Sequence, residues 1–432
     1  MRPRDAGAPM LLKREIGRTR RPTSRRRILV LLPCSPSADA VHGGGRVAAA
    51  LLGMIARCHD VAVLYLQTEG EPPMSEGLRR TCAFVIEVPR PTVRSEWEAR
   101  RRRLAAMLRL RPMATADWQT GKFRRAAARA IAQWRPDIIQ IEHLVMAQYL
   151  SICDPRVPKL LTIHEPGTLT ARERASAATG FVASAAARLE VALWERFERH
   201  ALEHVQAAVV FTARDRRAVE HATPGTPIAQ IPLGATIPDE PLNPTGSSPP
   251  RVCFVGSFIH PPNVDAAIRL ARDIFPTVRD RVPDAHLDLV GADPPANVVA
   301  LANASVTVTG RVPSVTPFLD AASVVVAPIR RGGGMRVKVL EALACGKPLV
   351  ASPIALEGLA DMRDGKEVLL AETDEQFADA ITRLLADAAQ RVTLAIHARE
   401  WACANLGWNL AAASYERLYE QLTNARSVAW SR

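Results

Sequence analysis

Long hydrophobic runs are missing from this 432-residue sequence. Its longest apolar stretches, such as Arg27–Pro33, have the length of a strand, whereas a helix that spans a bilayer needs roughly 20 apolar residues. Met1–Arg27 is basic throughout and contains no apolar segment like the core of a signal peptide. We therefore expect a cytoplasmic protein without a transmembrane helix.

Disulfide and metal-binding patterns are also lacking. The seven cysteines are dispersed, no CxxC pair occurs, and no cluster of cysteine and histidine has the spacing of a zinc site. No Asp-x-Asp motif stands in a credible loop. The sequence therefore predicts no disulfide, no metal site and no cofactor.

A net positive charge is missing from the chain outside two segments. Met1–Arg27 carries a net charge of +8 and Arg90–Arg135 one of +10, which leaves −6 for the rest of a chain whose total is +12. This pattern suits two local attachment surfaces better than a channel for DNA, so we expect no nucleic-acid partner.

The second basic segment also has an apolar side. Trp97, Leu104, Met107 and Leu108 fall on one face of a predicted helix, beside Arg100–Arg103. A basic amphipathic helix can lie on anionic lipid, and the alternative is an ordinary solvated face. The first interpretation predicts peripheral attachment to the inner face of the membrane.

Alternation of strands and helices divides the chain into two parts. Residues 1–26 read as a disordered basic tail, 27–240 as a first βα domain, and 241–250 as a linker within the proline-rich Pro238–Pro250. The alternation restarts over residues 251–400, and residues 401–425 form a C-terminal helix. The fold class is therefore α/β, with two Rossmann-like domains that face each other across a cleft.

Two local predictions concern helix limits. Ser35–Gly45 reads as a loop that ends in three glycines, followed by a helix over Arg46–Arg57. In the second domain, the spacing of apolar residues predicts one continuous helix over Val264–Asp280, whose buried face contains Val264, Ile268, Ala271, Phe275 and Val278.

The segment Val324–Ser352 carries the most chemical information. A strand ends near Pro328, a loop with three glycines follows, and a helix begins near Met335. Such glycines let the backbone approach a ligand, and the helix N-terminus offers N–H groups to a phosphate. The loop has neither the Walker A nor the GxGxxG pattern, so a plain glycine-rich turn beside solvated arginines is the competing interpretation.

This segment resembles the donor site of family-4 glycosyltransferases (glycosyltransferase group 1), which have the GT-B fold. The second half of the family motif is present as Glu341-Ala342-Leu343-Ala344-Cys345-Gly346-Lys347-Pro348. The resemblance implies that Glu341 holds the ribose of the nucleotide. The first glutamate of the motif falls on Gly333, which leaves open how the sugar hydroxyls are held. Further donor-site residues that the resemblance implies are Gly332, Gly334, Arg336 and Lys338.

Weaker similarity extends along the chain. Val255–Phe258 and Gly310–Val312 resemble other parts of the family's donor domain and add Gly256 and Arg311 to the donor-binding residues. Trp408–Tyr419 resembles the terminal helix that crosses back to the first domain.

The first domain contributes candidates for the acceptor side. His164 stands at the end of a strand and matches a histidine of the family that faces the cleft, so we predict a catalytic function for it. The acceptor or phosphate loop is predicted to contain Gly43, Gly44 and Gly45, which precede a helix, with Glu142 and His143 after another strand. A structural histidine and a plain glycine turn are the alternatives.

Taken together, the resemblance implies transfer of a sugar from a nucleotide-diphosphate sugar, with retention of configuration, to a glycan or lipid-linked acceptor of polysaccharide biosynthesis. Two alternatives stay open: a nucleotide-sugar epimerase or phosphorylase, and a degenerate GT-B scaffold that binds sugar or nucleotide without transferring it.

Overall fold

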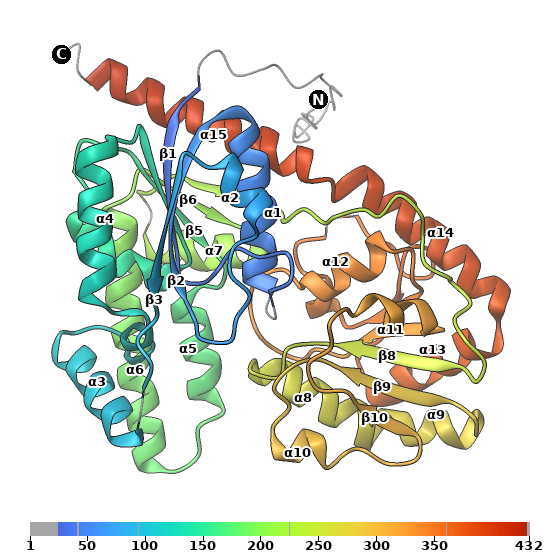
Figure 1. The fold of residues 1–432 in the computed structure, drawn as a ribbon. Coiled ribbons are helices and arrows are strands. Elements are labelled where there is room, and N and C mark those ends of the chain that lie inside the picture. Colours follow the sequence, from blue (N-terminus) through green and yellow to red (C-terminus); the bar gives the residue numbers. More distant parts are fainter. Residues whose placement is uncertain (1–24, 41–42, 94, 224, 360, 430–432) are drawn as a thin grey trace, which may run out of the picture.

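The computed structural model describes residues 25–40, 43–93, 95–223, 225–359 and 361–429. Two parallel sheets lie side by side, each covered by helices on both faces (Figure 1). This arrangement confirms the predicted fold class. Most of the predicted basic tail, residues 1–24, lies outside the described residues. Its last two residues belong to the folded domain, since Arg25 pairs with Asp60 at 2.9 Å and Arg26 with Glu416 at 2.8 Å.

The first sheet has seven parallel strands in the order β3-β2-β1-β4-β5-β6-β7. They are β1 (Arg27–Leu32), β2 (Asp60–Gln67), β3 (Phe84–Pro89), β4 (Ile138–Glu142), β5 (Lys159–Ile163), β6 (Ala207–Val210) and β7 (Ile228–Gln230). The helices of this domain are α1 (Gly43–Cys58), α2 (Glu76–Thr81), α3 (Glu96–Leu108), α4 (Gly121–Trp134), α5 (Gly167–Ser176), α6 (Phe181–Glu203) and α7 (Ala213–Ala222).

The second sheet has six parallel strands in the order β10-β9-β8-β11-β12-β13. They are β8 (Arg251–Val255), β9 (His286–Val290), β10 (Val306–Val308), β11 (Val324–Ala327), β12 (Leu349–Ala351) and β13 (Leu369–Leu370). The helices are α8 (Pro261–Arg269), α9 (Phe275–Arg281), α10 (Ala296–Val299), α11 (Thr316–Ala321), α12 (Val337–Ala344), α13 (Asp374–Ala386) and α14 (Ala388–Asn405).

Both sheets reverse their strand order at one point, between β1 and β4 and between β8 and β11. The loops that leave two such neighbouring strands run to opposite faces, so a crevice opens beyond their carboxyl ends. Every predicted site residue except Arg311 lies at the end of one of these four strands, or of β5 beside them, or in the loop or helix that follows it. The topology therefore places most of the candidates at the two crevices.

The last helix ties the domains together. α15 (Trp408–Ala429) leaves α14 and runs along the first domain, against α1 and β4 (Figure 1). At its start, the indole of Trp408 lies so close to Gly234 that a Cβ atom there would be 2.5 Å away. Tyr419 donates a hydrogen bond to the buried Gln140 of β4. The helix thus packs into the first domain, as the crossing helix was expected to do.

Two local predictions were wrong. The three glycines at 43–45 form the first turn of α1 and are not a loop. The helix expected over Val264–Asp280 is divided by a π turn at Leu270–Ile274. Pro276 explains the division, because it has no N–H to donate and its ring would clash with the carbonyl four residues back, so the chain widens before it.

Candidate active site between the two domains

The loop before α12 has a conformation that requires glycine at two positions. Gly332 and Gly334 have φ angles of +108° and +70°, which side chains rarely adopt, whereas Gly333 has no such value. Arg336 holds the loop from within, because its guanidinium donates to the carbonyls of Gly332, at 2.7 Å, and of Gly333. The conformation of the predicted donor loop is therefore stabilised by hydrogen bonds from Arg336.

This loop lies directly against the first domain. A Cβ atom on Gly334 would be 2.5 Å from the carbonyl oxygen of His164. A Cβ atom on Gly43, at the start of α1, would be 2.9 Å from a methyl group of Val337, the first residue of α12. The tertiary structure thus brings the three glycines of α1, the donor loop and His164 into one place.

His164 is held by three neighbours. Its Nε2 lies 2.9 Å from Oε2 of Glu142, and its ring stacks on His143 at 3.6 Å and meets the edge of Phe211 at 4.9 Å. The sheet explains this group, because β4 and β5 are neighbouring parallel strands whose carboxyl ends meet at one edge. The side chain of His164 stays 13% exposed, which leaves it accessible from the cleft.

Glu142 orients the histidine. It is 2% exposed, and its Oε1 accepts hydrogen bonds from Gln140, at 2.6 Å, and from Thr162, at 2.8 Å. With that oxygen occupied, Oε2 faces His164. An ionised carboxylate only accepts, so the bond needs the proton on Nε2 of the imidazole and leaves Nδ1 as the basic nitrogen.

On the donor side, Glu341 reaches the first domain. Its Oε1 lies 3.2 Å from Nη2 of Arg46 on α1, and its Oε2 is buried without a hydrogen-bond partner among the described residues. Burial raises the pKa of Glu341, while Arg46 and Lys338 lower it. Lys338, one helical turn earlier on α12, donates its hydrogen bond to Asn263 and not to Glu341.

Lys338 lies beside the first strand of the second domain. Its Nζ donates to Oδ1 of Asn263 at 2.6 Å and stands 4.2 Å above the ring of Phe254. A Cβ atom on Gly256 would be 2.8 Å from this ammonium group, so Gly256 and Lys338 are neighbours, as predicted donor-site partners should be. Burial lowers the pKa of Lys338 well below its ordinary value, with Arg336 contributing. A bound anion would raise the pKa of Lys338 again, because a nearby negative charge favours the charged lysine.

Arg311 is the predicted residue that the structure does not bring into this group. It is exposed and lies on the loop after β10, at the edge of the second sheet. Among the described residues, it makes no hydrogen bond or ion pair with the loop at 332–336. Arg330 and Arg331, which directly precede the three glycines of the donor loop, pair with Asp374 and Asp265.

Several cleft residues were not predicted, and all of them belong to the first domain. Glu165 accepts a hydrogen bond from the N–H of Gly333 at 3.2 Å, and Glu173 one from Gly332 at 3.3 Å. Arg214 on α7 donates to the carbonyl of Gly332 at 3.0 Å and pairs with Glu173. No local signal distinguishes these charged residues from surface ones, since their contacts with the donor loop join residues more than 100 positions apart.

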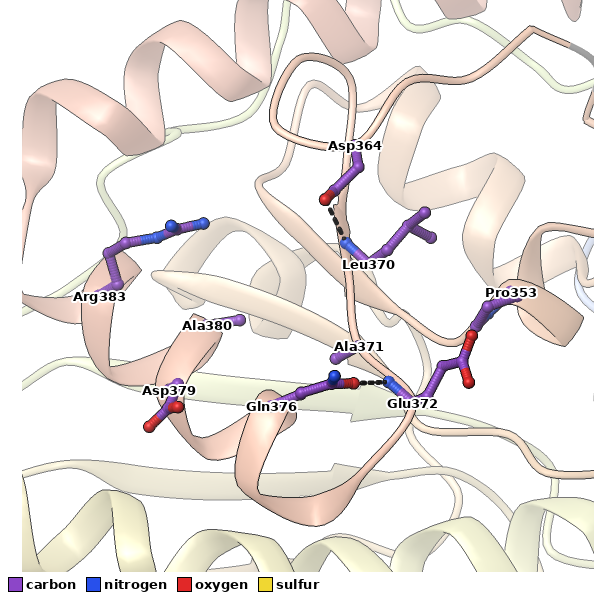
Figure 2. A pocket seen from close by; sticks show the side chains of 9 residues that line it. All are labelled: Pro353, Asp364, Leu370, Ala371, Glu372, Gln376, Asp379, Ala380 and Arg383. Carbon is purple, nitrogen blue, oxygen red and sulfur yellow. Dashed lines mark hydrogen bonds between the residues drawn. The ribbon is translucent and has the colours of Figure 1, made fainter.

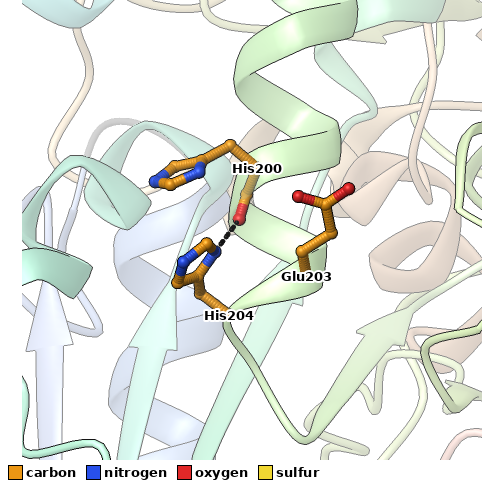
Figure 3. Close-up of side chains that lie close together, drawn as sticks. All are labelled: His200, Glu203 and His204. Carbon is orange, nitrogen blue, oxygen red and sulfur yellow. Dashed lines mark hydrogen bonds between the residues drawn. The ribbon is translucent and has the colours of Figure 1, made fainter.

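Two other features lie apart from this group. A hollow of about 480 Å³ opens where β13 leads into α13, lined by Asp364, Glu372, Gln376, Asp379 and Arg383 (Figure 2). On the last turn of α6, the exposed His200, Glu203 and His204 have ligand atoms within 4.8 Å of one another, so they are the described residues that could hold a metal ion (Figure 3). Neither contains a predicted site residue.

Comparison with known proteins agrees with this fold. Residues 249–387 match the model of a family described as glycosyl transferases group 1. Sucrose-phosphate synthase from Thermosynechococcus elongatus superposes with a TM-score of 0.70 at 19% identity, over 93% of this chain and 100% of that one. The fold is GT-B. Residues 249–387 of its second domain are similar to the group 1 glycosyltransferases.

Other GT-B structures are similar to the chain. Anabaena HepE in complex with UDP and glucose has a TM-score of 0.60 and 14% identity, over 90% of this chain and 98% of that one. Trehalose 6-phosphate synthase from Burkholderia multivorans has a TM-score of 0.62 and 13% identity, over 93% and 99%. No curated protein matches the sequence. Among the described residues, no helix is both long and apolar enough to cross a bilayer.

Proposed function

We propose that this GT-B protein transfers a sugar from a nucleoside-diphosphate sugar to an acceptor hydroxyl, with retention of configuration. The observation that carries the proposal is the contact of the donor loop with His164, where a Cβ atom on Gly334 would be 2.5 Å from the histidine carbonyl. A donor on the second domain would therefore present its sugar to the strand ends of the first.

Positive groups suit the departing nucleoside diphosphate. Arg46, Arg336 and Lys338 surround the start of α12, and the first N–H groups of a helix favour an anion. These groups would stabilise the charge that develops on the diphosphate as the bond to the sugar breaks. Glu341 has one oxygen on Arg46 and another with no partner in the part of the chain that the structure describes, so it could accept hydrogen bonds from the ribose hydroxyls.

His164 is the proposed catalytic residue on the acceptor side. Glu142 holds its Nε2–H, so the ring keeps one orientation, and Nδ1 can accept a hydrogen bond from a hydroxyl of the sugar or the acceptor. We propose a glycan or a lipid-linked molecule as the acceptor. The HepE structure, which holds UDP and glucose, gives a starting pair of ligands for tests.

The first experiment is a thermal-shift screen of UDP-, GDP- and ADP-sugars, followed by measurement of nucleoside diphosphate release with and without candidate acceptors. We expect one nucleotide to stabilise the protein, by about 2.7 kcal/mol at 100 times its dissociation constant. Slow hydrolysis without acceptor would support an enzyme. Binding without any turnover would favour a scaffold, and interconversion of sugars in the bound donor would favour an epimerase.

We further propose peripheral attachment to an anionic membrane. Trp97, Leu104 and Leu108 on α3 are 70%, 55% and 78% exposed, and Phe181 and Val182 at the start of α6 are 89% and 80% exposed. Both elements lie at the lower end of the first domain in Figure 1. Large apolar side chains beside Arg100–Arg103 match the chemistry of an anionic lipid surface better than that of water.

Vesicle binding tests this attachment. We expect binding to anionic vesicles that falls steeply between low and physiological salt, and that weakens in a Trp97→Ser, Leu108→Ser variant and on removal of residues 1–24. Ile396→Ser, which alters an exposed apolar residue of α14, is the matched control. Equal binding to neutral and anionic vesicles would reject the electrostatic part, and no binding at low salt would reject the attachment.

A further inference from the structure

We propose that Glu165 of the first domain supplies the carboxylate that Gly333 lacks, accepts hydrogen bonds from the hydroxyls of the donor sugar, and so determines which sugar is used. This inference rests on the proposed function and deepens it, because it concerns the sugar half of the same site.

The starting observation is the space beside Gly333. A Cβ atom added there would lie 3.1 Å from Cγ of Glu165 and 3.3 Å from Oδ1 of Asp215. A side chain at position 333 would thus project into a volume that already holds two carboxylate side chains of the opposite domain. The donor loop has no side chain at position 333, but carboxylate side chains of the first domain lie beside it.

The backbone itself does not demand glycine at this position. Gly332 and Gly334 have positive φ angles and Gly333 does not, so only the central glycine could carry a side chain without backbone strain. A Cβ atom there would meet Cγ of Glu165 at 3.1 Å, so a side chain would fit only if Glu165 moved by a few tenths of an ångström. The glycine at 333 and the glutamate at 165 are therefore complementary.

The two carboxylates differ in their availability. Asp215 is fully buried, and its Oδ2 accepts a hydrogen bond from Thr212 at the start of α7. Its Oδ1 has no hydrogen-bond partner among the described residues, but burial keeps that oxygen out of reach of a sugar in the cleft. Glu165 is exposed, and its one hydrogen bond among the described residues comes from the Gly333 N–H at 3.2 Å. A carboxylate has about four acceptor sites, so most of this group's capacity is free for hydroxyl donors.

The position of Glu165 in the chain also fits. It directly follows His164, at the end of β5, where the donor loop touches the first domain. A sugar carried by the second domain and presented to His164 would pass this carboxylate. Sugar hydroxyls make good donors to an ionised acceptor, and such bonds distinguish sugars that differ in one hydroxyl.

The test compares binding of whole donors with binding of their nucleotides. Dissociation constants of UDP-glucose, GDP-mannose and ADP-glucose, and of UDP, GDP and ADP, are measured by calorimetry for wild type, Glu165→Gln and Glu165→Ala. We expect the preferred nucleotide sugar to bind roughly tenfold more weakly to both variants, as for loss of a charged hydrogen bond. The matching nucleoside diphosphate should change by less than about twofold. Glu195→Gln, an exposed carboxylate of α6 paired with Arg172, is the control.

A reciprocal variant separates this function from a structural one. Gly333→Glu alone sets two carboxylates against each other and should weaken sugar binding. Combined with Glu165→Ala, it returns a carboxylate to the same volume, and should recover at least half of the lost affinity on a logarithmic scale.

The outcomes are distinct. Equal weakening of nucleotide sugar and nucleoside diphosphate, or no recovery in the double variant, would overturn the proposal for Glu165 while leaving glycosyl transfer intact. Failure of the wild type to bind any of the six compounds would instead overturn the proposed function, and this inference with it.

Discussion

Glu341 shows how one side chain joins the two domains. Its carboxylate pairs with Arg46 through one oxygen, and the other is buried without a partner among the described residues, an arrangement that is costly unless a ligand supplies a donor. The sequence pointed to this residue through its motif, and the structure adds the reason why it would bind a hydroxyl.

Replacing Glu341 by alanine should weaken nucleotide binding by about 1–3 kcal/mol, the usual cost of losing a hydrogen bond to a charged group. Calorimetry with the nucleoside diphosphate found in the screen measures this change. The fold should be unaffected, which circular dichroism can check. Wild-type affinity in the variant would show that Glu341 serves only the contact with Arg46.

A second prediction at the residue scale concerns the effect of His164 and Glu142 on kcat. His164→Ala should reduce kcat by about 100-fold or more while changing donor affinity little, because the histidine belongs to the acceptor-side domain. Glu142→Gln should reduce kcat by a smaller factor, since an amide can hold the wrong tautomer of the ring. Unchanged kcat in His164→Ala would reject a catalytic function, and lost donor affinity would move the residue to the donor site.

At the scale of elements, the buried His59 holds α15 against the first domain. His59, on the turn between α1 and β2, is 1% exposed and faces Oε2 of Glu416 on α15 at 2.6 Å, while its Nδ1 accepts the N–H of Arg26 at 3.3 Å. Burial lowers the pKa of His59 from its ordinary value of 6.5, Arg26 and Arg25 lower it further, and Glu416 opposes them.

This arrangement predicts a loss of stability in acid. Between 6.5 and the lower pKa of the folded state, the unfolded chain binds a proton on His59 that the folded chain does not. The contribution is therefore present above pH 6.5 and is lost as the pH falls through the folded value. Urea unfolding at several pH values should show a steeper fall for wild type than for His59→Asn, which cannot titrate. Parallel curves would contradict the prediction.

The packing of the helices also determines which apolar faces are buried. Helix α1 packs against α15 and β2, and α15 packs against β4, so their apolar residues are covered. The apolar face of α3, in contrast, is left open beside its arginines. The same amphipathic pattern in the sequence thus led to two different environments, because periodicity reports a face and not what covers it.

For the whole molecule, the supply of positive charge in the cleft predicts that transfer needs no divalent ion. Arg46, Arg336 and Lys338, with the start of α12, can balance a diphosphate. Turnover should therefore stay within about twofold after treatment with EDTA, a change too small to correspond to a lost charge interaction. His200→Ala provides a control for ions bound on α6. Activity lost to EDTA and restored by magnesium or manganese would contradict this.

Much of the architecture was predictable from local patterns. Short apolar runs separated by helical segments indicated two parallel sheets, and the Pro/Ser-rich segment before Arg251 indicated the break between them. Glu142, His143 and His164 could be placed at strand ends for the same reason. Neighbouring parallel strands share an edge, so local signals located half of the candidate site.

The sequence by itself thus determined the two-domain α/β fold and the glycine loop with Glu341, because turn residues, strand lengths and motifs are local properties. Only the tertiary structure decided that Glu165 fills the space beside Gly333, that Arg46 meets Glu341, and that Arg311 stays outside the group. The two contacts join residues far apart in the chain and on different domains. These contacts depend on how the surfaces of the two domains meet. No periodicity or spacing within either domain encodes that arrangement.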